Sequence, residues 1–174
     1  MPINPQHLLD QAKRLIGIAP AAVEADLRRG ISSAYYALFH LLIQETMSSV
    51  VIDPSFRPKV ARALQHGSMR SVCDKYNPAK RNSLGQYIAK EGHGFPQQVI
   101  TPELRQVAAT FIALYAAREK ADYDEGVTVQ HTEALTLVQQ AEAAFQAWLT
   151  AQVPPSGTTF LQELLCRSII KRER

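Results

Sequence analysis

The sequence predicts an all-α protein, an up-and-down bundle of four to five main helices with an extra helix at the C-terminus. Of the 174 residues 46% are hydrophobic and only eight are glycine, a balance that favours helices over strands. Apolar residues recur at helical spacing along several stretches, and proline and glycine fall between those stretches. The length suits one compact domain with a real core.

Two helices are expected near the N-terminus. The first covers residues 5–16, because Asn4 suits an N-cap and Pro5 the first helical position. The second is longer and runs from about Pro20 to about Met47. Together they form the first pair of the bundle.

The middle of the chain is expected to hold one helix and a long connection. Asp53-Pro54 marks a turn, and a helix over about 58–76 follows it. Residues 77–100 contain several glycines and prolines and form a connection, with a short helix at about 86–90.

Two further main helices complete the predicted bundle. Thr101-Pro102-Glu103 provides a cap, a proline and an acid for the start of a helix that reaches about Tyr123. The next helix covers about 129–152, where apolar residues recur at helical spacing.

A proline-rich linker, 153–157, separates the last segment from the bundle. Thr159 and Gln162 match a capping box for a final amphipathic helix that ends near Lys171. We therefore divide the chain into a helical bundle, 1–152, and a C-terminal helix, 153–174. That helix has two candidate docking partners, its own bundle or another protein.

A polar stripe marks the second helix. Arg29, Ser33, Tyr36 and His40 follow one another at steps of four, three and four, which places them along one side of a helix. The opposite side already carries enough apolar residues for packing (Val23, Leu27, Ile31, Ala34, Leu38 and Leu42). The stripe either lines a groove or an interface, or places Tyr36 and His40 in the core.

A second candidate motif closes the helix that ends near Tyr123. Arg118 lies on the face expected to meet the core, and Asp122 follows one turn later. An arginine on an apolar face needs a partner, so the two are expected to pair. Such a pair belongs either to a binding site with Tyr123 or to a structural contact between helices.

The two motifs together resemble the HEPN superfamily, in particular its small stand-alone bacterial and archaeal proteins. The segments are Ser32-Ser33-Ala34-Tyr35-Tyr36-Ala37-Leu38-Phe39-His40 and Arg118-Glu119-Lys120-Ala121-Asp122-Tyr123-Asp124, within a match over roughly 5–150. The resemblance implies a four- or five-helix bundle that is commonly dimeric. Many HEPN proteins are metal-independent ribonucleases of toxin or defence systems, and others bind nucleotides, nucleic acid or a partner protein.

The chain departs from the catalytic pattern of that superfamily, in which an arginine precedes a histidine by a short fixed spacing. Tyr123 stands where the histidine after Arg118 is expected, and a tyrosine is a poor general base at neutral pH. Catalysis would therefore require Arg118 with His40 or His66 as the acid–base group. The main hypothesis is a binding and assembly module in a defence or toxin–antitoxin setting, and the alternative is a metal-independent ribonuclease.

Charge and composition complete the expectations. Residues 57–90 hold eight lysines and arginines against one acid, a net charge of +7 in a chain of +3. This segment is either a solvated loop or a contact for phosphate, so RNA or a nucleotide is an expected partner, as is a second copy or another protein. No membrane span, signal peptide, cofactor or metal-ligand spacing is expected, and two isolated cysteines favour a cytoplasmic location.

Overall fold

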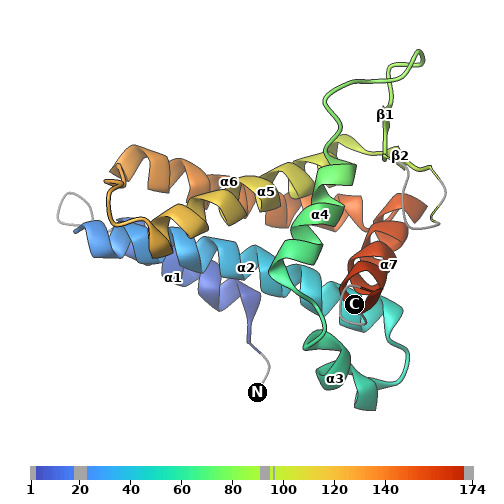
Figure 1. Ribbon diagram of the computed structural model, residues 1–174, viewed down its shortest axis with the longest axis horizontal. Coiled ribbons are helices and arrows are strands. Elements are labelled where there is room, and N and C mark those ends of the chain that lie inside the picture. Colours follow the sequence, from blue (N-terminus) through green and yellow to red (C-terminus); the bar gives the residue numbers. More distant parts are fainter. Residues whose placement is uncertain (1–2, 18–22, 91–94, 96, 171–174) are drawn as a thin grey trace. The chain divides into compact units, whose positions relative to one another are not determined.

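A computed structural model describes residues 3–17, 23–90, 95 and 97–170, and over these residues it confirms the all-α class (Figure 1). The described part contains seven α-helices, one 3₁₀ turn and one short hairpin. The helices are α1 (Pro5–Gly17), α2 (Glu24–Val50), α3 (Arg57–Ala61), α4 (His66–Tyr76), α5 (Pro102–Tyr123), α6 (His131–Ala151) and α7 (Pro155–Ile170). The 3₁₀ turn η1 is Pro54–Phe56, and the antiparallel strands are β1 (Tyr87–Ile88) and β2 (Val99–Ile100).

The chain divides into two compact units. Unit 1 comprises Met1–Leu41 and Thr110–Phe145, and unit 2 comprises Leu42–Ala109 and Gln146–Arg174. Each unit has its own buried core.

Unit 1 packs α1 closely against the first part of α2. A Cβ added at Gly30 would lie 2.5 Å from Cδ1 of Ile16, so the missing side chain of glycine allows this approach. Lys13 of α1 pairs with Glu142 of α6, and a ring nitrogen of His131 lies 3.0 Å from the Ile16 carbonyl oxygen. The core consists of fully buried apolar side chains (Leu9, Ile16, Ile31, Leu38, Phe111 and Leu114).

The predicted apolar face of α2 is confirmed with one exception. Leu27, Ile31, Ala34, Leu38 and Leu42 are all buried, as their spacing predicts. Only Val23, one residue before the helix begins, is 61% exposed. The apolar face of α2 is therefore separate from its polar stripe.

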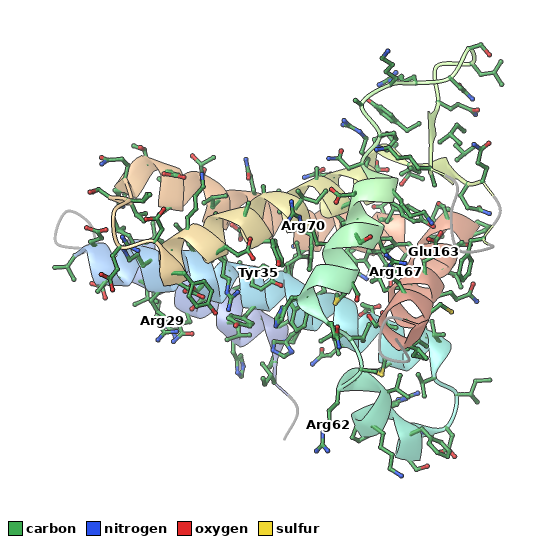
Figure 2. All side chains as sticks on the ribbon, in the orientation of Figure 1. Arg29, Tyr35, Arg62, Arg70, Glu163 and Arg167 are labelled. Carbon is green, nitrogen blue, oxygen red and sulfur yellow. The ribbon has the colours of Figure 1, made fainter. Side chains whose placement is uncertain are left out.

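Unit 2 places α4 beside α7 (Figure 1). Glu163 of α7, labelled in Figure 2, is only 2% exposed and pairs with Lys75 of α4. Its other oxygen accepts a hydrogen bond of 2.9 Å from the Tyr76 hydroxyl. The Tyr76 ring meets Phe160 edge to face at 4.9 Å, and Phe160 in turn meets Trp148 at 6.2 Å. A buried ionic group and an aromatic cluster thus join the two helices.

The prediction of one continuous helix over 58–76 is wrong, because the segment forms two separate helices. The chain forms η1 and α3, turns at residues 62–65, and begins again as α4. Gln65 is extended, with φ −113° and ψ 139°, although no glycine or proline stands there. Ala63 and Leu64 in the turn are buried, so burial of these two side chains outweighs the helical preference of the segment.

The short helix predicted at 86–90 is also wrong, because residues 87–88 form strand β1. Tyr87 pairs with Ile100 and Ile88 with Val99. These are aromatic and β-branched residues that favour strands, and their partners lie too far along the chain to appear in a local pattern. The glycines at 92 and 94 lie outside the described residues.

The remaining helix boundaries agree with expectation except at the C-terminal helix and at the end of α2, which reaches Val50 and not about Met47. The helices expected at 5–16, 102–123 and 129–152 are confirmed to within two residues. The start expected at Pro20 and the end near Lys171 lie outside the described residues. Helix α7 begins at Pro155, so Thr159 is not a cap, and its hydroxyl donates back to the Pro155 carbonyl. The predicted division at 152/153 remains a prediction, although α7 packs on α4 within unit 2.

Within the described part of the chain, none of the helices is both long and apolar enough to cross a membrane.

Candidate functional site

The polar stripe of α2 lines an open groove of about 500 Å³ in unit 1. The α2 side of the groove contains the four residues of the stripe and Ser32. The α1 side contributes Leu8 and Gln11, and Ile3 lies just before α1. The described residues that line the groove are Ile3, Leu8, Gln11, Arg29, Ser32, Ser33, Tyr36 and His40. The predicted stripe therefore faces a space large enough for a small ligand.

The groove has a polar wall and an apolar wall. Ser33 is buried and donates a hydrogen bond of 3.2 Å to the side-chain oxygen of Gln11, which connects α2 to α1 across the groove. Because that bond uses the Gln11 oxygen, the amide nitrogen of Gln11 is left to donate to a ligand. Leu8 and Ile3 supply the apolar surface.

Tyr36 and His40 form a stacked pair in the groove. Their ring centroids are 6.3 Å apart with an angle of 28° between the planes, as expected for residues one turn apart. Both side chains are half-buried. Burial lowers the pKa of His40 below its ordinary value, so the imidazole is neutral at pH 7 and keeps one nitrogen lone pair.

Arg118 lies behind Tyr36 and contacts three side chains. Its Nη2 donates to the hydroxyls of Tyr36 at 3.2 Å and of Tyr123 at 3.3 Å. Its Nε lies 2.7 Å from Oδ2 of Asp122, an ion pair in which the N–H does not point at the oxygen. Desolvation acts to lower the pKa of Arg118, but Tyr36, Asp122 and Tyr123 outweigh it and raise the pKa. Arg118 is thus a permanent cation with its charge compensated.

A second contact joins the same two helices one turn away. The hydroxyl of Ser32, a buried residue of α2, donates to Oδ1 of Asp122 in α5. One carboxylate oxygen of Asp122 therefore forms the ion pair with Arg118, and the other accepts the hydrogen bond from Ser32. The two sequence motifs meet at two points, and both points touch residues that line the groove.

Arg28, unlike its neighbour Arg29, donates hydrogen bonds to backbone carbonyls near the end of α5. Its guanidinium donates to the carbonyl oxygens of Ala121 at 2.9 Å and Asp124 at 3.0 Å, and to that of Val127. These carbonyls lie at and beyond the end of α5, where helix carbonyls lack partners within the helix. Arg28 thereby fixes the end of α5 and the motif that it carries.

Arg29 is the exposed cation of the groove. In Figure 2 its side chain extends away from the ribbon of α2. Among the residues that the structure describes, it has no ion-pair partner. It also lines a smaller hollow of about 280 Å³ next to Asp122. Its charge is available to an anionic ligand.

The structure brings most of the predicted site residues together. Arg29, Ser33, Tyr36 and His40 line the groove, while Arg118 and Asp122 support it from α5. Tyr123 is 72% exposed and does not line the groove, although it bonds to Arg118. His66 begins α4 in unit 2 and is not among the lining residues.

Two contributors were missed from the sequence. Gln11 of α1 carries no motif, and only its place on the helix that packs against α2 makes it part of the groove. Ser32 was seen in the motif, but its bond to Asp122 needs the tertiary contact between α2 and α5. Among the described residues, no three His, Cys, Asp or Glu side chains are grouped so that they could hold a metal ion.

Comparison of this chain with protein-family models, with curated proteins and with solved structures gave no match.

Proposed function

We propose that unit 1 is a binding module whose groove takes a nucleotide, either free or as part of an RNA chain. The observation that supports this most strongly is the shared lining of one open groove by Arg29, Tyr36, His40 and Gln11. Its volume of about 500 Å³ falls in the range of ordinary small-molecule sites.

The chemistry of the lining fits the parts of a nucleotide. The exposed guanidinium of Arg29 suits a phosphate, which it can bind with two parallel hydrogen bonds. The rings of Tyr36 and His40 suit the flat surface of a base, and the Gln11 amide suits its polar edge. One groove therefore offers a cation for the phosphate, aromatic rings for the face of the base and an amide for its polar edge.

Binding is favoured over catalysis because the charge of Arg118 is already compensated by Asp122. A phosphate that approached Arg118 would have to compete with Asp122 and with the hydroxyls of Tyr36 and Tyr123. We assign Arg118 the role of positioning Tyr36, and Arg29 the role of contacting the phosphate.

The rival function is a metal-independent ribonuclease, and one observation favours it. His40 is neutral and lines the same groove as Arg29, as a general base next to a phosphate-binding cation would be. In this version Arg118 or Arg29 holds the scissile phosphate and His40 moves the proton.

Calorimetric titration with the four ribonucleoside 5′-monophosphates tests the binding proposal. We expect Arg29→Gln to weaken binding about tenfold, which corresponds to about 1.4 kcal/mol. Arg14→Gln is the matched control, because Arg14 is an exposed arginine of α1 outside the groove lining. Equal losses in the two variants, or no binding by the wild type, would reject the groove as the site.

Incubation of a single-stranded RNA with the protein in EDTA separates the two functions. Binding without cleavage favours the module. Cleavage that disappears in folded Arg118→Ala and His40→Ala variants establishes the ribonuclease. Cleavage that persists in both variants rejects the catalytic site formed by these residues.

The wider setting follows from the resemblance to HEPN proteins. That resemblance supports a homodimer or a partner protein, and a defence or toxin–antitoxin role, for this module. Sedimentation equilibrium at several protein concentrations tests the homodimer, which requires a mass of twice 19.3 kDa.

A further inference from the structure

Unit 2 contains a tyrosine that lies under two arginines. The Cζ atom of Arg81 is 4.7 Å from the centroid of the Tyr87 ring, and that of Arg105 is 4.4 Å from the same centroid. Tyr87 belongs to β1, the first strand of the hairpin that follows α4 (Figure 1). Arg105 comes from α5, so the cluster joins two segments that are distant in sequence.

Local structure holds both arginines in place. The backbone of Arg81 pairs with Tyr87 in an antiparallel bridge. The turn between them is closed by Asn82, whose side-chain oxygen accepts hydrogen bonds from the backbone N–H groups of Leu84 and Gln86. Gly85 takes the positive φ of 73° that the turn requires.

A hydrogen bond to the loop that follows α4 holds the Arg105 side chain. Its Nε donates a hydrogen bond of 3.1 Å to the Pro78 carbonyl oxygen, in the loop between α4 and β1. Because the Arg105 guanidinium and the Arg81 backbone are held before a ligand arrives, less freedom is lost when the two side chains bind one. This arrangement differs from a mobile, lysine-rich loop.

The two charges lie close together without a carboxylate between them. Since 4.7 Å and 4.4 Å are measured to one centroid, the two Cζ atoms are at most 9.1 Å apart. Neither arginine has an ion-pair partner among the residues that the structure describes. Two neighbouring cations repel each other, and an anion between or beside them relieves that repulsion.

The titration of Tyr87 agrees with this positive environment. Its pKa lies below the ordinary value for tyrosine, first because of a hydrogen bond with Arg81 and also because of the charges of Arg105 and Arg81.

We propose that Arg81 and Arg105, held over the Tyr87 ring, bind phosphate groups of a single-stranded RNA backbone. Guanidinium groups match the geometry of phosphate oxygens. The ring faces that the arginines cover are not open to a base, so the cluster recognises the backbone and not the sequence. The surrounding segment 57–90, with its net charge of +7, favours a polyanion over a single phosphate.

This site is independent of the groove in unit 1. Its experiment uses a 5′-labelled single-stranded RNA of mixed sequence, fluorescence anisotropy and a series of salt concentrations. The variants are Arg81→Gln, Arg105→Gln, the double variant, Tyr87→Phe and Tyr87→Ala. Arg62→Gln is the matched control, because Arg62 is an exposed arginine of the same basic segment outside the cluster.

We expect the double variant to bind at least tenfold more weakly than the wild type. The slope of log affinity against log salt should fall by about 1.4, since each phosphate contact to a single strand contributes about 0.7. Tyr87→Phe keeps the ring and should bind within about twofold of the wild type, whereas Tyr87→Ala should lose affinity as the single arginine variants do.

Two results would overturn this inference. The first is an Arg62→Gln variant that weakens binding as much as each cluster variant does, which would mean that only diffuse charge acts. The second is a set of cluster variants that lose binding to vesicles containing anionic phospholipid and retain binding to RNA, which would assign the cluster to a membrane surface. Circular dichroism and thermal unfolding of each variant show whether a loss of binding arises from a loss of fold.

Discussion

Arg118, near the end of α5, donates a hydrogen bond of 3.2 Å to the hydroxyl of Tyr36 in α2. This bond connects the polar stripe to the second motif, and it fixes the ring that forms one part of the groove. With the Ser32–Asp122 bond it makes the contact between α2 and α5 a specific one.

Replacement of Arg118 should destabilise the protein more than replacement of its hydroxyl partner. Arg118→Ala removes the ion pair, two hydrogen bonds and the cation–π contacts, and we expect the free energy of unfolding to fall by about 2 kcal/mol. Tyr36→Phe removes the hydroxyl that accepts from Arg118 and should lower the free energy of unfolding by about 1 kcal/mol. Urea unfolding measures both, and an equal loss in the two variants would contradict the central place given to Arg118.

The pH dependence of stability should carry a contribution from His40. Its pKa is lowered in the folded protein by burial, so between its folded and unfolded pKa values the unfolded state binds more protons. The contribution is fully present above the unfolded pKa of about 6.5 and is lost as the pH falls through that value toward the folded pKa. The difference in unfolding free energy between the wild type and His40→Gln should therefore decrease from pH 7.5 to pH 5.5, and a difference that stays constant would show that His40 is not desolvated.

Glu163 should be among the most sensitive residues of unit 2. Glu163→Ala removes the buried carboxylate that pairs with Lys75 and accepts from Tyr76, and we expect a loss of about 3 kcal/mol in unfolding free energy. Tyr76→Phe removes only the hydroxyl that donates to Glu163 and should cost about 1 kcal/mol. The double variant Lys75→Met with Glu163→Leu should recover much of the loss, because it removes both charges together. If the double variant recovers none of the lost unfolding free energy, Lys75 and Glu163 do more than compensate each other's charge.

Three glycine-to-alanine changes should have three different effects. An added Cβ at Gly157 would lie 2.3 Å from the Ala151 carbonyl oxygen, and backbone atoms cannot move aside easily, so Gly157→Ala should destabilise most. At Gly30 the clash is with the end of the Ile16 side chain, so the loss should be smaller. Gly17→Ala meets no atom within 4 Å and should be neutral or slightly stabilising. Thermal unfolding gives the order, and a Gly157→Ala variant as stable as the wild type would contradict the close packing of α7.

The fold class was predictable because it depends on local patterns. The apolar spacing of α2 and the cap and proline before α5 both identify their helices without any tertiary information. The break between α3 and α4 was not predictable, since it results from burial of Ala63 and Leu64 and not from a helix-breaking residue. The β1–β2 hairpin was missed for a similar reason, because its strands are stabilised by pairing across ten intervening residues.

The α2 side of the candidate site was predictable from the sequence, whereas its α1 side and its contacts with α5 were not. The positions of Arg29, Ser33, Tyr36 and His40 on one side of α2 follow from helical geometry alone. The opposite wall, with Gln11, depends on how α1 packs against α2 at Gly30. The pairing of Arg118 with Asp122 was expected from their spacing, but the bonds to Tyr36 and Ser32 could come only from the structure.

The central claim is that the groove binds a nucleotide, and an NMR titration tests it most directly. The histidine resonances of the isotope-labelled protein are followed as a ribonucleoside 5′-monophosphate is added. His40 lines the groove, whereas His131 in the same unit contacts the Ile16 carbonyl oxygen and is not among the lining residues. We predict a saturable shift of the His40 resonance, assigned with His40→Gln, while the His131 resonance stays in place. A His40 resonance that does not move at saturating nucleotide, or a His131 resonance that moves as much, would contradict the groove as the nucleotide site.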